Sequence, residues 1–500
     1  MAGFEDYEAY DGLGLAELLR AKQVGPRDLL EAAIARIERH NPALNAVVHE
    51  MYDAARRTIA DGLPEGPFTG VPFLMKDLGA LTSGAPTTNG SRLFADYVAD
   101  HDTTLTERVR TAGLVVMGKT NTPEMGVSPA CEPVLHGATR NPWNRSRSPG
   151  GSSGGAAAAV AAGLVPMAHG SDGGGSIRIP AANCGLFGLK PTRARNPAGP
   201  DVGEGWSGLA TIHAVTRSVR DSAALLDATS GPAPGDPYWA PPPARPFLDE
   251  VGAAVEPLRI GAAIAGTRAA RFSSEASTAV ENTAKQLEAL GHRVEEAEPD
   301  YDAAALGEAF MAIFAVAIAQ EIEDRAAATG QTPSTHNLER NNLWLLERGR
   351  ALSAVDLKRA LLGINTATRN FARFFEDYDV WLTPTMATPP PPLGHLDADV
   401  DDVELFFERL WTFNPLNSIY NAAGQPAITL PLHMSEDGLP IGVMLGARFG
   451  EESLLLRLSA QLETAMPWAD RHPPIGLWAG TPRGVSTRAG LSEPPTAPVA

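Results

Sequence analysis

The segment 148–192 limits the possible folds of this chain more than any other stretch of its sequence. A glycine–serine turn at 150–155 is followed by an alanine-rich run at 156–162, which has high helix propensity and little bulk. An apolar run at 164–168 is predicted to form a strand, and a second glycine turn follows at 172–176. The segment therefore predicts a small helix and a short strand that are bounded by turns of bare backbone.

The second turn, Asp172-Gly173-Gly174-Gly175-Ser176, is the first candidate for a functional site. Three successive glycines are costly to order, because glycine loses more conformational freedom on folding than any other residue. Their bare backbone can direct several N–H groups toward one point, where developing negative charge would be stabilised. Ser176 could then attack a carbonyl carbon whose oxygen those groups hold, so it is the candidate nucleophile. The alternative is a flexible linker, but apolar segments and the charged Asp172 and Arg178 interrupt the stretch.

Three parts of this segment together resemble the signature of the amidase signature family of serine amide hydrolases. They are 150–155 (GGSSGG), 170–181 (GSDGGGSIRIPA) and 188–191 (GLKP). The resemblance implies one compact α/β domain over about 1–479, with a central mixed β-sheet surrounded by helices and a signature core at about 70–195. It also implies an enzyme that hydrolyses C–N acyl bonds without a metal or an organic cofactor.

The resemblance further implies a Ser–cis-Ser–Lys triad. Ser176 matches the nucleophile, and Lys76 matches the lysine. Ser152 matches the bridging serine, whose preceding peptide bond with Gly151 is cis in the family. The oxyanion hole corresponds to the backbone N–H groups of Gly173, Gly174, Gly175 and Ser176.

Lys76 ends an apolar run at 71–75 and is followed by Asp77. From the residues alone, a solvated lysine or an ion pair with Asp77 is the alternative interpretation. As a base, Lys76 must be neutral, and burial would lower its pKa by penalising the charged form. Neutral Lys76 would take a proton from Ser152 as Ser152 takes one from Ser176, and the reverse relay would protonate the leaving amine.

The substrate pocket is predicted from the same resemblance. In the family the region after the strand at 114–117 lines the acyl-binding pocket, and Met125, Val127 and, from a predicted long helix, Phe314 are the candidate substrate-binding residues. The runs at 118–126 and 137–144 look most like bacterial amidases and 6-aminohexanoate cyclic-dimer (nylon oligomer) hydrolases. The chain departs from the latter at Val127, where a polar residue is expected, and at Phe314, where a smaller thiol is expected. We therefore expect an apolar pocket for aryl or alkyl amides, with nylon-type oligomers, carbamates (urethanes) and esters as further substrates.

Two other functions are consistent with parts of the sequence. One is the amidotransferase A subunit of the same family, which acts on a charged tRNA with partner subunits. The other is nucleotide binding at 113–120, which matches the pattern GxxxxGK[ST] of a phosphate-binding loop. We reject this motif, because the residues between its glycines, LVVM, favour a buried strand and Gly113 would cap a preceding helix.

The acidic composition excludes some partners. The chain has 59 acidic and 41 basic residues and a net charge of −18, which argues against binding to a nucleic-acid backbone. Its two cysteines, Cys131 and Cys184, exclude a disulfide framework but leave one disulfide open, and they suggest a reducing compartment. The N-terminus lacks a signal-peptide pattern, and we expect no apolar run of membrane-spanning length. We therefore expect a cytoplasmic protein that meets a small-molecule substrate and no nucleic acid or membrane, with a homodimer left open.

Alternating periodicities predict helices and strands in the rest of the chain. Near the glycine turns, His136 and His169 are expected to make structural hydrogen bonds, and Asp172 and Arg178 to pair and orient the turn. Residues 480–500, which are rich in Pro, Ser, Thr and Gly, are expected to be disordered. The resemblance also implies a loop followed by a core strand within 423–431. Helices are predicted at 13–20, 26–40, 52–61, 104–112, 216–230, 275–290, 303–328, 336–375 and 452–463, and further strands at 46–49, 258–264, 292–296, 380–385 and 440–446.

Overall fold

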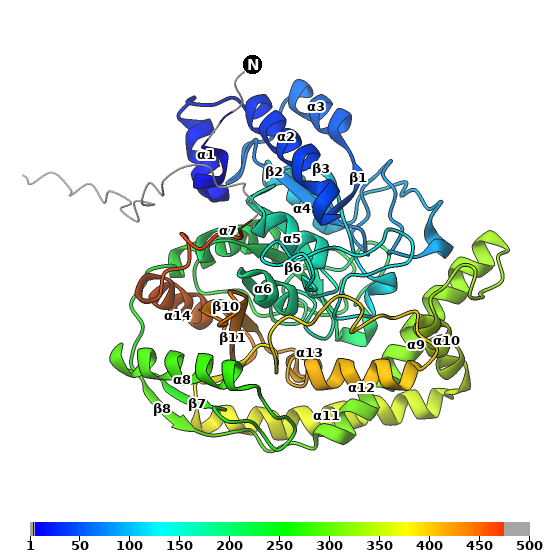
Figure 1. Ribbon diagram of the computed structural model, residues 1–500, viewed down its shortest axis with the longest axis vertical. Helices are drawn as coiled ribbons and strands as arrows, with labels where there is room; N and C mark the ends of the chain where they lie inside the picture. The colour runs from blue at the N-terminus through cyan, green and yellow to red at the C-terminus, as the bar shows by residue number, and fades with distance from the viewer. Residues whose placement is uncertain (1–3, 5, 475–500) are drawn as a thin grey trace, which may run out of the picture.

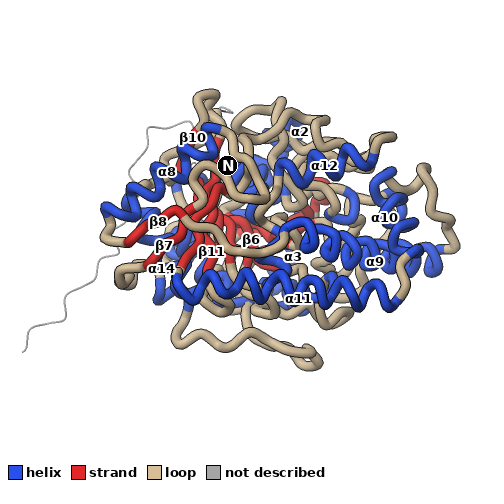
Figure 2. Tube along the Cα trace, turned by 90° about the horizontal axis from the view of Figure 1, so that it is seen from below, coloured by secondary structure: helices blue, strands red, loops and turns tan. Residues whose placement is uncertain are grey.

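The computed structural model describes residues 4 and 6–474, so the predicted tail at 480–500 lies outside the described residues. Within the described part, 11 strands form one mixed sheet in the order β1-β3-β2-β4-β6-β5-β10-β11-β9-β7-β8, and 14 α-helices surround it (Figure 1). This is the single α/β domain that the resemblance implies. Figure 2 shows the strands gathered inside the molecule with helices around them.

The sheet combines parallel and antiparallel pairs. The pairs β2–β3 and β2–β4 and the pairs β7–β8 and β7–β9 are parallel, and the strands between these two regions are antiparallel. In chain order the strands are β1 (Val47–Glu50), β2 (Pro72–Lys76), β3 (Val115–Thr120), β4 (Met167–Asp172), β5 (Phe187–Lys190), β6 (Thr211–Thr216), β7 (Arg259–Ala262), β8 (Arg293–Glu296), β9 (Val380–Pro384), β10 (Ala427–Met434) and β11 (Pro440–Ala447).

The helices cover both faces of this sheet. They are α1 (Gly12–Arg20), α2 (Pro26–Leu44), α3 (Tyr52–Asp61), α4 (Thr104–Thr111), α5 (Gly154–Ala161), α6 (Arg178–Cys184), α7 (Val219–Thr229), α8 (Ser274–Ala289), α9 (Ala303–Thr329), α10 (Arg340–Ala351), α11 (Ala354–Asp377), α12 (Val403–Phe413), α13 (Ser418–Ala423) and α14 (Glu452–Ala465). Along β11, Val443 and Leu445 pack on the side of α7, α8 and α14, whereas Met444 packs on the side of α9, α11 and α13. Side chains alternate between the faces of a strand, so an almost wholly apolar strand is buried on both sides.

The alanine-rich helix α5 lies in the centre because its side chains are small. All eight of its residues are buried, and it packs against β2, β3, β4 and β6. A Cβ atom on Gly155 would lie only 2.4 Å from the backbone nitrogen of Asn121. This close approach fixes the start of α5, and with it Ser152, against the sheet.

Several predicted boundaries are wrong. The strand predicted at 164–168 is instead β4, Met167–Asp172, because Leu164 N–H bonds back to the Ala159 carbonyl and the turn out of α5 takes up the residues before Met167. The helix predicted at 26–40 continues to Leu44, because Pro42 in its last turn loses only one backbone hydrogen bond there.

Two other regions also differ from the prediction. The region 216–230 begins with the end of strand β6, and helix α7 starts only after Ser218, whose side chain caps it. The region 336–375 forms two helices, separated where Ser353 and Asp356 form a capping box at the start of α11.

Helix α9 also contradicts the expectation that no apolar run reaches membrane-spanning length. Among the described residues it is the one helix that is long and apolar enough to span a membrane by length and composition, with a mean hydropathy of 1.8 over its most apolar 18 residues. In the fold, α9 packs against α10 and α11, and its residues Phe310 and Phe314 belong to an apolar cluster. This packing accounts for its composition.

Candidate active site

Three segments that are far apart in the sequence meet beside the centre of the sheet. Lys76 is the last residue of β2, Ser152 precedes α5, and Ser176 lies in the glycine turn between β4 and α6. The backbone N–H of Ser153 donates to the carbonyl of Ser176 at 3.2 Å, which joins the two serine-bearing turns directly. The Gly151–Ser152 peptide bond is cis, as the resemblance implies.

Lys76 is completely buried, and its amine contacts two hydroxyl groups. Its Nζ lies 2.6 Å from Ser152 Oγ and 2.9 Å from Ser171 Oγ. Burial lowers the pKa of Lys76 to about 7, although the nearby Asp172 carboxylate acts in the opposite direction. The amine is thus neutral in a large fraction of molecules near neutral pH, as a general base requires. Asp77 does not pair with Lys76, because its carboxylate contacts His49, Thr88 and His136.

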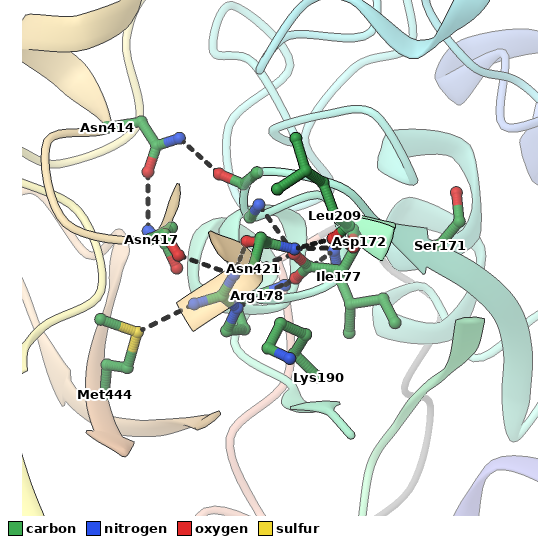
Figure 3. A network of polar contacts seen from close by, with 12 residues as sticks. Ser171, Asp172, Ile177, Arg178, Lys190, Leu209, Asn414, Asn417, Asn421 and Met444 are labelled. Carbon is green, nitrogen blue, oxygen red and sulfur yellow. Dashed lines mark hydrogen bonds and ion pairs between the residues drawn. The ribbon is translucent and has the colours of Figure 1, made fainter. Parts of the chain in front are cut away.

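A buried ion pair between Asp172 and Arg178 supports the glycine turn (Figure 3). The guanidinium of Arg178 lies 2.8 Å from Asp172 Oδ1, and neither side chain is exposed to solvent. Burial alone would raise the pKa of the Asp172 carboxyl, but Arg178 outweighs it and holds this pKa well below its usual range. The Asp172 carboxylate also accepts the N–H groups of Gly175 and Ile177, at 2.8 and 3.2 Å. The expectation that Asp172 and Arg178 pair and orient the turn is confirmed.

One peptide unit of the turn is fixed on both sides. The Gly174 carbonyl accepts a 2.8 Å hydrogen bond from Asn414 Nδ2, and the N–H of Gly175 donates to Asp172. Gly175 N–H is therefore occupied, which departs from the predicted four-donor oxyanion hole. For the N–H groups of Gly173, Gly174 and Ser176, the described part of the chain offers no hydrogen-bond acceptor.

A small apolar cavity of about 50 Å³ opens beside Ser176. Its aromatic wall is built by ring contacts, with the Trp206 and Phe314 centroids 4.7 Å apart and the Phe310 and Trp411 centroids 6.0 Å apart. Of the described residues that line it, none carries a formal charge. They are Gly126, Val127, Ser128, Pro129, Gly174, Ser176, Ile179, Trp206, Phe310, Met311, Phe314, Phe407, Leu410, Trp411 and Asn414.

The three predicted substrate-binding residues do not all reach this cavity. Val127 and Phe314 line it. Met125 is fully buried and is not among the lining residues, whereas Gly126, which follows it in the 3₁₀ turn Glu124–Gly126, does line the cavity.

Residues 113–120 do not form a phosphate-binding loop, in agreement with the rejection of the P-loop pattern. The first glycine, Gly113, has φ 85° and follows the end of α4, and Val115–Thr120 forms the fully buried strand β3. The Lys119 amine donates to the carbonyl of Ala80. Cys131 and Cys184 are both buried free thiols, so the disulfide left open above does not form.

Comparison with known proteins shows the family of this chain. The sequence model of the amidase family matches residues 28–456. The chain belongs to the amidase family. This amidase is 41% identical over 488 residues to the 6-aminohexanoate-cyclic-dimer hydrolase of Paenarthrobacter ureafaciens, and the match covers 93% of this chain and 96% of the relative.

Solved structures resemble this amidase along nearly its whole length. A 6-aminohexanoate cyclic dimer hydrolase in complex with its substrate superposes with a TM-score of 0.88 at 38% identity, covering 94% of this chain and 99% of the other. A bacterial aryl acylamidase of the amidase signature family superposes with a TM-score of 0.83 at 27% identity, covering 92% and 97%. The chain is therefore an enzyme that hydrolyses amide bonds.

Sequence reasoning missed the residues that support the turn from the distant C-terminal part of this amidase. Asn421 Nδ2 donates to the Asp172 carbonyl at 2.8 Å, and its Oδ1 accepts from Arg178 at 2.7 Å. Asn417 Nδ2 in turn donates to Asn414 Oδ1 at 2.7 Å. No local signal in the sequence identifies them, because Asn414 and Asn417 lie between α12 and α13 and only Asn421 lies within a helix.

Proposed function

We propose that this amidase cleaves its substrate through an acyl-enzyme on Ser176, with Ser152 and Lys76 as a proton relay. The observation that carries the proposal is the 2.6 Å contact between Lys76 Nζ and Ser152 Oγ in a fully buried setting, with a lysine pKa of about 7. A partly exposed Ser176 on the wall of the cavity supports its assignment as the nucleophile.

In the proposed reaction, neutral Lys76 accepts the hydroxyl proton of Ser152 while Ser152 accepts that of Ser176. Ser176 Oγ then forms a bond to the carbonyl carbon of the substrate, and the carbonyl oxygen becomes negatively charged. Collapse of this intermediate breaks the C–N bond, and the proton held by Lys76 returns through Ser152 to the leaving amine. Water attacks the resulting ester by the same relay and releases the acid and free Ser176.

The negative oxygen would be held by the N–H groups of Gly173, Gly174 and Ser176. Their freedom from other acceptors supports this assignment, because a donor that is already bonded cannot stabilise new charge. The bonds of Asn414 and Asp172 to the Gly174–Gly175 peptide unit fix the orientation of the neighbouring N–H groups before the substrate arrives. Gly173 must lack a side chain, since a Cβ there would lie 2.4 Å from the Trp206 ring.

For the substrate, we propose small neutral amides with apolar, in particular aromatic, groups. The support is a cavity walled by Trp206, Phe310 and Phe314 without a charged lining residue. Carbamates, esters and nylon-type oligomers are further candidates, because the same acyl transfer applies to each and apolar contacts discriminate loosely between them. The relationship to a cyclic-dimer hydrolase makes 6-aminohexanoate oligomers a natural comparison substrate.

The proposal is tested by labelling the protein with phenylmethanesulfonyl fluoride and mapping the adduct by mass spectrometry. We expect one adduct on Ser176 and parallel loss of p-nitroacetanilide hydrolysis. Ser176→Ala should lose both. Ser153→Ala is the matched control, because Ser153 adjoins Ser152 but its hydroxyl contacts the Ser171 backbone, and it should keep the label. Turnover by folded Ser176→Ala, or an adduct on a different serine, would contradict the proposal.

A further inference from the structure

A cluster of side chains that can bind a metal ion lies outside the proposed triad. His49 is on β1, Asp77 directly follows β2, and His136 lies in the loop between β3 and α5. One ligand atom from each of the three side chains lies within 4.8 Å of the other two. Three separate segments of the chain thus contribute two imidazoles and one carboxylate to a single point.

The spacing within this cluster does not suit direct hydrogen bonds. The Nε2 atoms of His49 and His136 each lie 3.6 Å from the same oxygen, Asp77 Oδ2. That separation is too long for a hydrogen bond, whereas ligands about 2.0–2.1 Å from a tetrahedral ion lie about 3.3–3.4 Å apart. The Nε2 atom of His49 is buried and, within the described chain, has no hydrogen-bond partner. A bound ion would satisfy it.

The carboxylate is held in place by hydrogen bonds. Asp77 is fully buried, its Oδ1 accepts the Thr88 N–H at 2.9 Å, and Oδ2 contacts the Thr88 hydroxyl. The nearby Lys119 is directed elsewhere, because its amine donates to Ala80 and Thr87. Among the described basic residues, His49 and His136 are the two whose side-chain nitrogens lie within 4 Å of this carboxylate.

We propose that His49 Nε2, His136 Nε2 and Asp77 Oδ2 bind one divalent transition-metal ion of the zinc type, with water in the fourth position. Two imidazoles and a carboxylate are a donor set that such ions prefer. The histidine side chains are 21% and 15% exposed, so an ion can enter from solvent. His136 would carry its proton on Nδ1, and the Thr88 hydroxyl, 3.0 Å from His136 Nε2, would remain a donor to Asp77.

The ion would support the fold and take no part in the amide chemistry. It would cross-link β1, the end of β2 and the loop that carries His136. Its ligand at the end of β2, Asp77, directly follows the proposed base Lys76. An ion that binds only the folded state raises the melting temperature. The inference does not depend on the proposed mechanism, since none of its three ligands belongs to the proposed relay.

The test uses full-length, tag-free protein that has been treated with EDTA and exchanged into metal-free buffer. Co²⁺ is titrated while visible absorption is recorded, and Zn²⁺ binding is measured by calorimetry and by the change in melting temperature. The variants are His49→Gln and His136→Gln, each of which keeps a polar side chain. His101→Gln is the matched control, because His101 also contacts two carboxylates, those of Asp100 and Asp201, but at the surface.

We expect one equivalent of Co²⁺ or Zn²⁺ to bind to the parent protein and to His101→Gln, with visible bands typical of tetrahedral cobalt. Each ligand variant should bind at least roughly 10- to 100-fold more weakly and lose the zinc-induced rise in melting temperature. No saturable binding to the parent would overturn the proposal and leave a hydrogen-bonded cluster. Equal binding by both ligand variants would overturn it as well. If one variant fails to fold, the other decides the question.

Discussion

The proposed base predicts how the activity of this amidase depends on pH. Lys76 can accept a proton only when it is neutral, so kcat/KM should rise with pH and level off above the pKa of about 7 that burial gives it. A solvated lysine, with a pKa of about 10.4, would be neutral in only about 0.04% of molecules at pH 7, whereas Lys76 would be neutral in about half. From pH 5 to pH 8 its neutral fraction rises from about 1% to about 90%, so kcat/KM should rise about 90-fold.

The assay is p-nitroaniline release from p-nitroacetanilide at low substrate concentration, because neither substrate nor product titrates between pH 5 and 8. Lys119 and Lys190 provide matched controls, since burial lowers their pKa values to about 8 and about 7, yet their amines donate to backbone carbonyls. Glu124→Gln is a third control, because burial raises the pKa of this carboxyl to about 7. The midpoint should stay near 7 in Lys119→Met, Lys190→Met and Glu124→Gln.

A flat profile between pH 5 and 8, with folding confirmed by circular dichroism at both limits, would refute a neutral lysine as the base. A midpoint that shifts by a full pH unit or disappears in Lys190→Met or Glu124→Gln would assign the titration to another group. In either case the 2.6 Å contact of Lys76 with Ser152 would have to be interpreted as structural.

Three further predictions follow from the site. Arg178→Met leaves the Asp172 carboxylate buried without its partner and should lower the free energy of unfolding by about 3–5 kcal/mol in urea denaturation, and full stability in this variant would contradict the importance of the pair. Asn414→Ala removes the bond to the Gly174 carbonyl, worth about 1 kcal/mol, and should lower kcat about fivefold with little change in KM; a change in KM alone would indicate a contact with substrate instead. Phe314→Ala enlarges the cavity, so kcat/KM for benzoyl anilides should rise relative to kcat/KM for acetyl anilides, and the free energy of unfolding should fall by about 3–5 kcal/mol. An unchanged ratio of the two kcat/KM values would place the acyl group outside this cavity.

The sequence could predict those features that depend on local backbone chemistry. The glycine turn at 172–176 forms where the sequence predicts it, because glycines beside a serine and an acidic residue favour a turn of bare backbone. The sequence also excludes a P-loop at 113–120, because an apolar run such as 114–117 favours a buried strand over an open loop, and these residues are buried. Helix α3 was predicted at its observed bounds from spacing alone.

Features that depend on distant partners could not be predicted in this way. Asn414 and Asn421 contact the turn across more than 230 residues of sequence, and no local pattern connects them to it. The sequence predicts Met125 in the pocket because its loop reaches the pocket, but Met125 packs in the apolar cluster with Val127 and Phe314 and does not line the cavity. The boundaries of β4 were wrong because pairing with β6 extends the strand through the polar residues His169 to Asp172, which hydrophobicity alone does not identify.

The ion pair of Asp172 with Arg178 and the hydrogen bond from Asn414 have different consequences for the glycine turn. The ion pair of Asp172 with Arg178 has no solvent exposure, so it contributes mainly by keeping a costly run of glycines in one conformation. The Asn414 bond acts on the single peptide unit between Gly174 and Gly175, and so on the direction of the N–H groups on either side of it. Disruption of the first should therefore reduce stability, and disruption of the second should reduce the rate. A variant pair that reversed this division, with Arg178→Met slow but stable and Asn414→Ala unstable but fast, would show that the turn is held by contacts other than these.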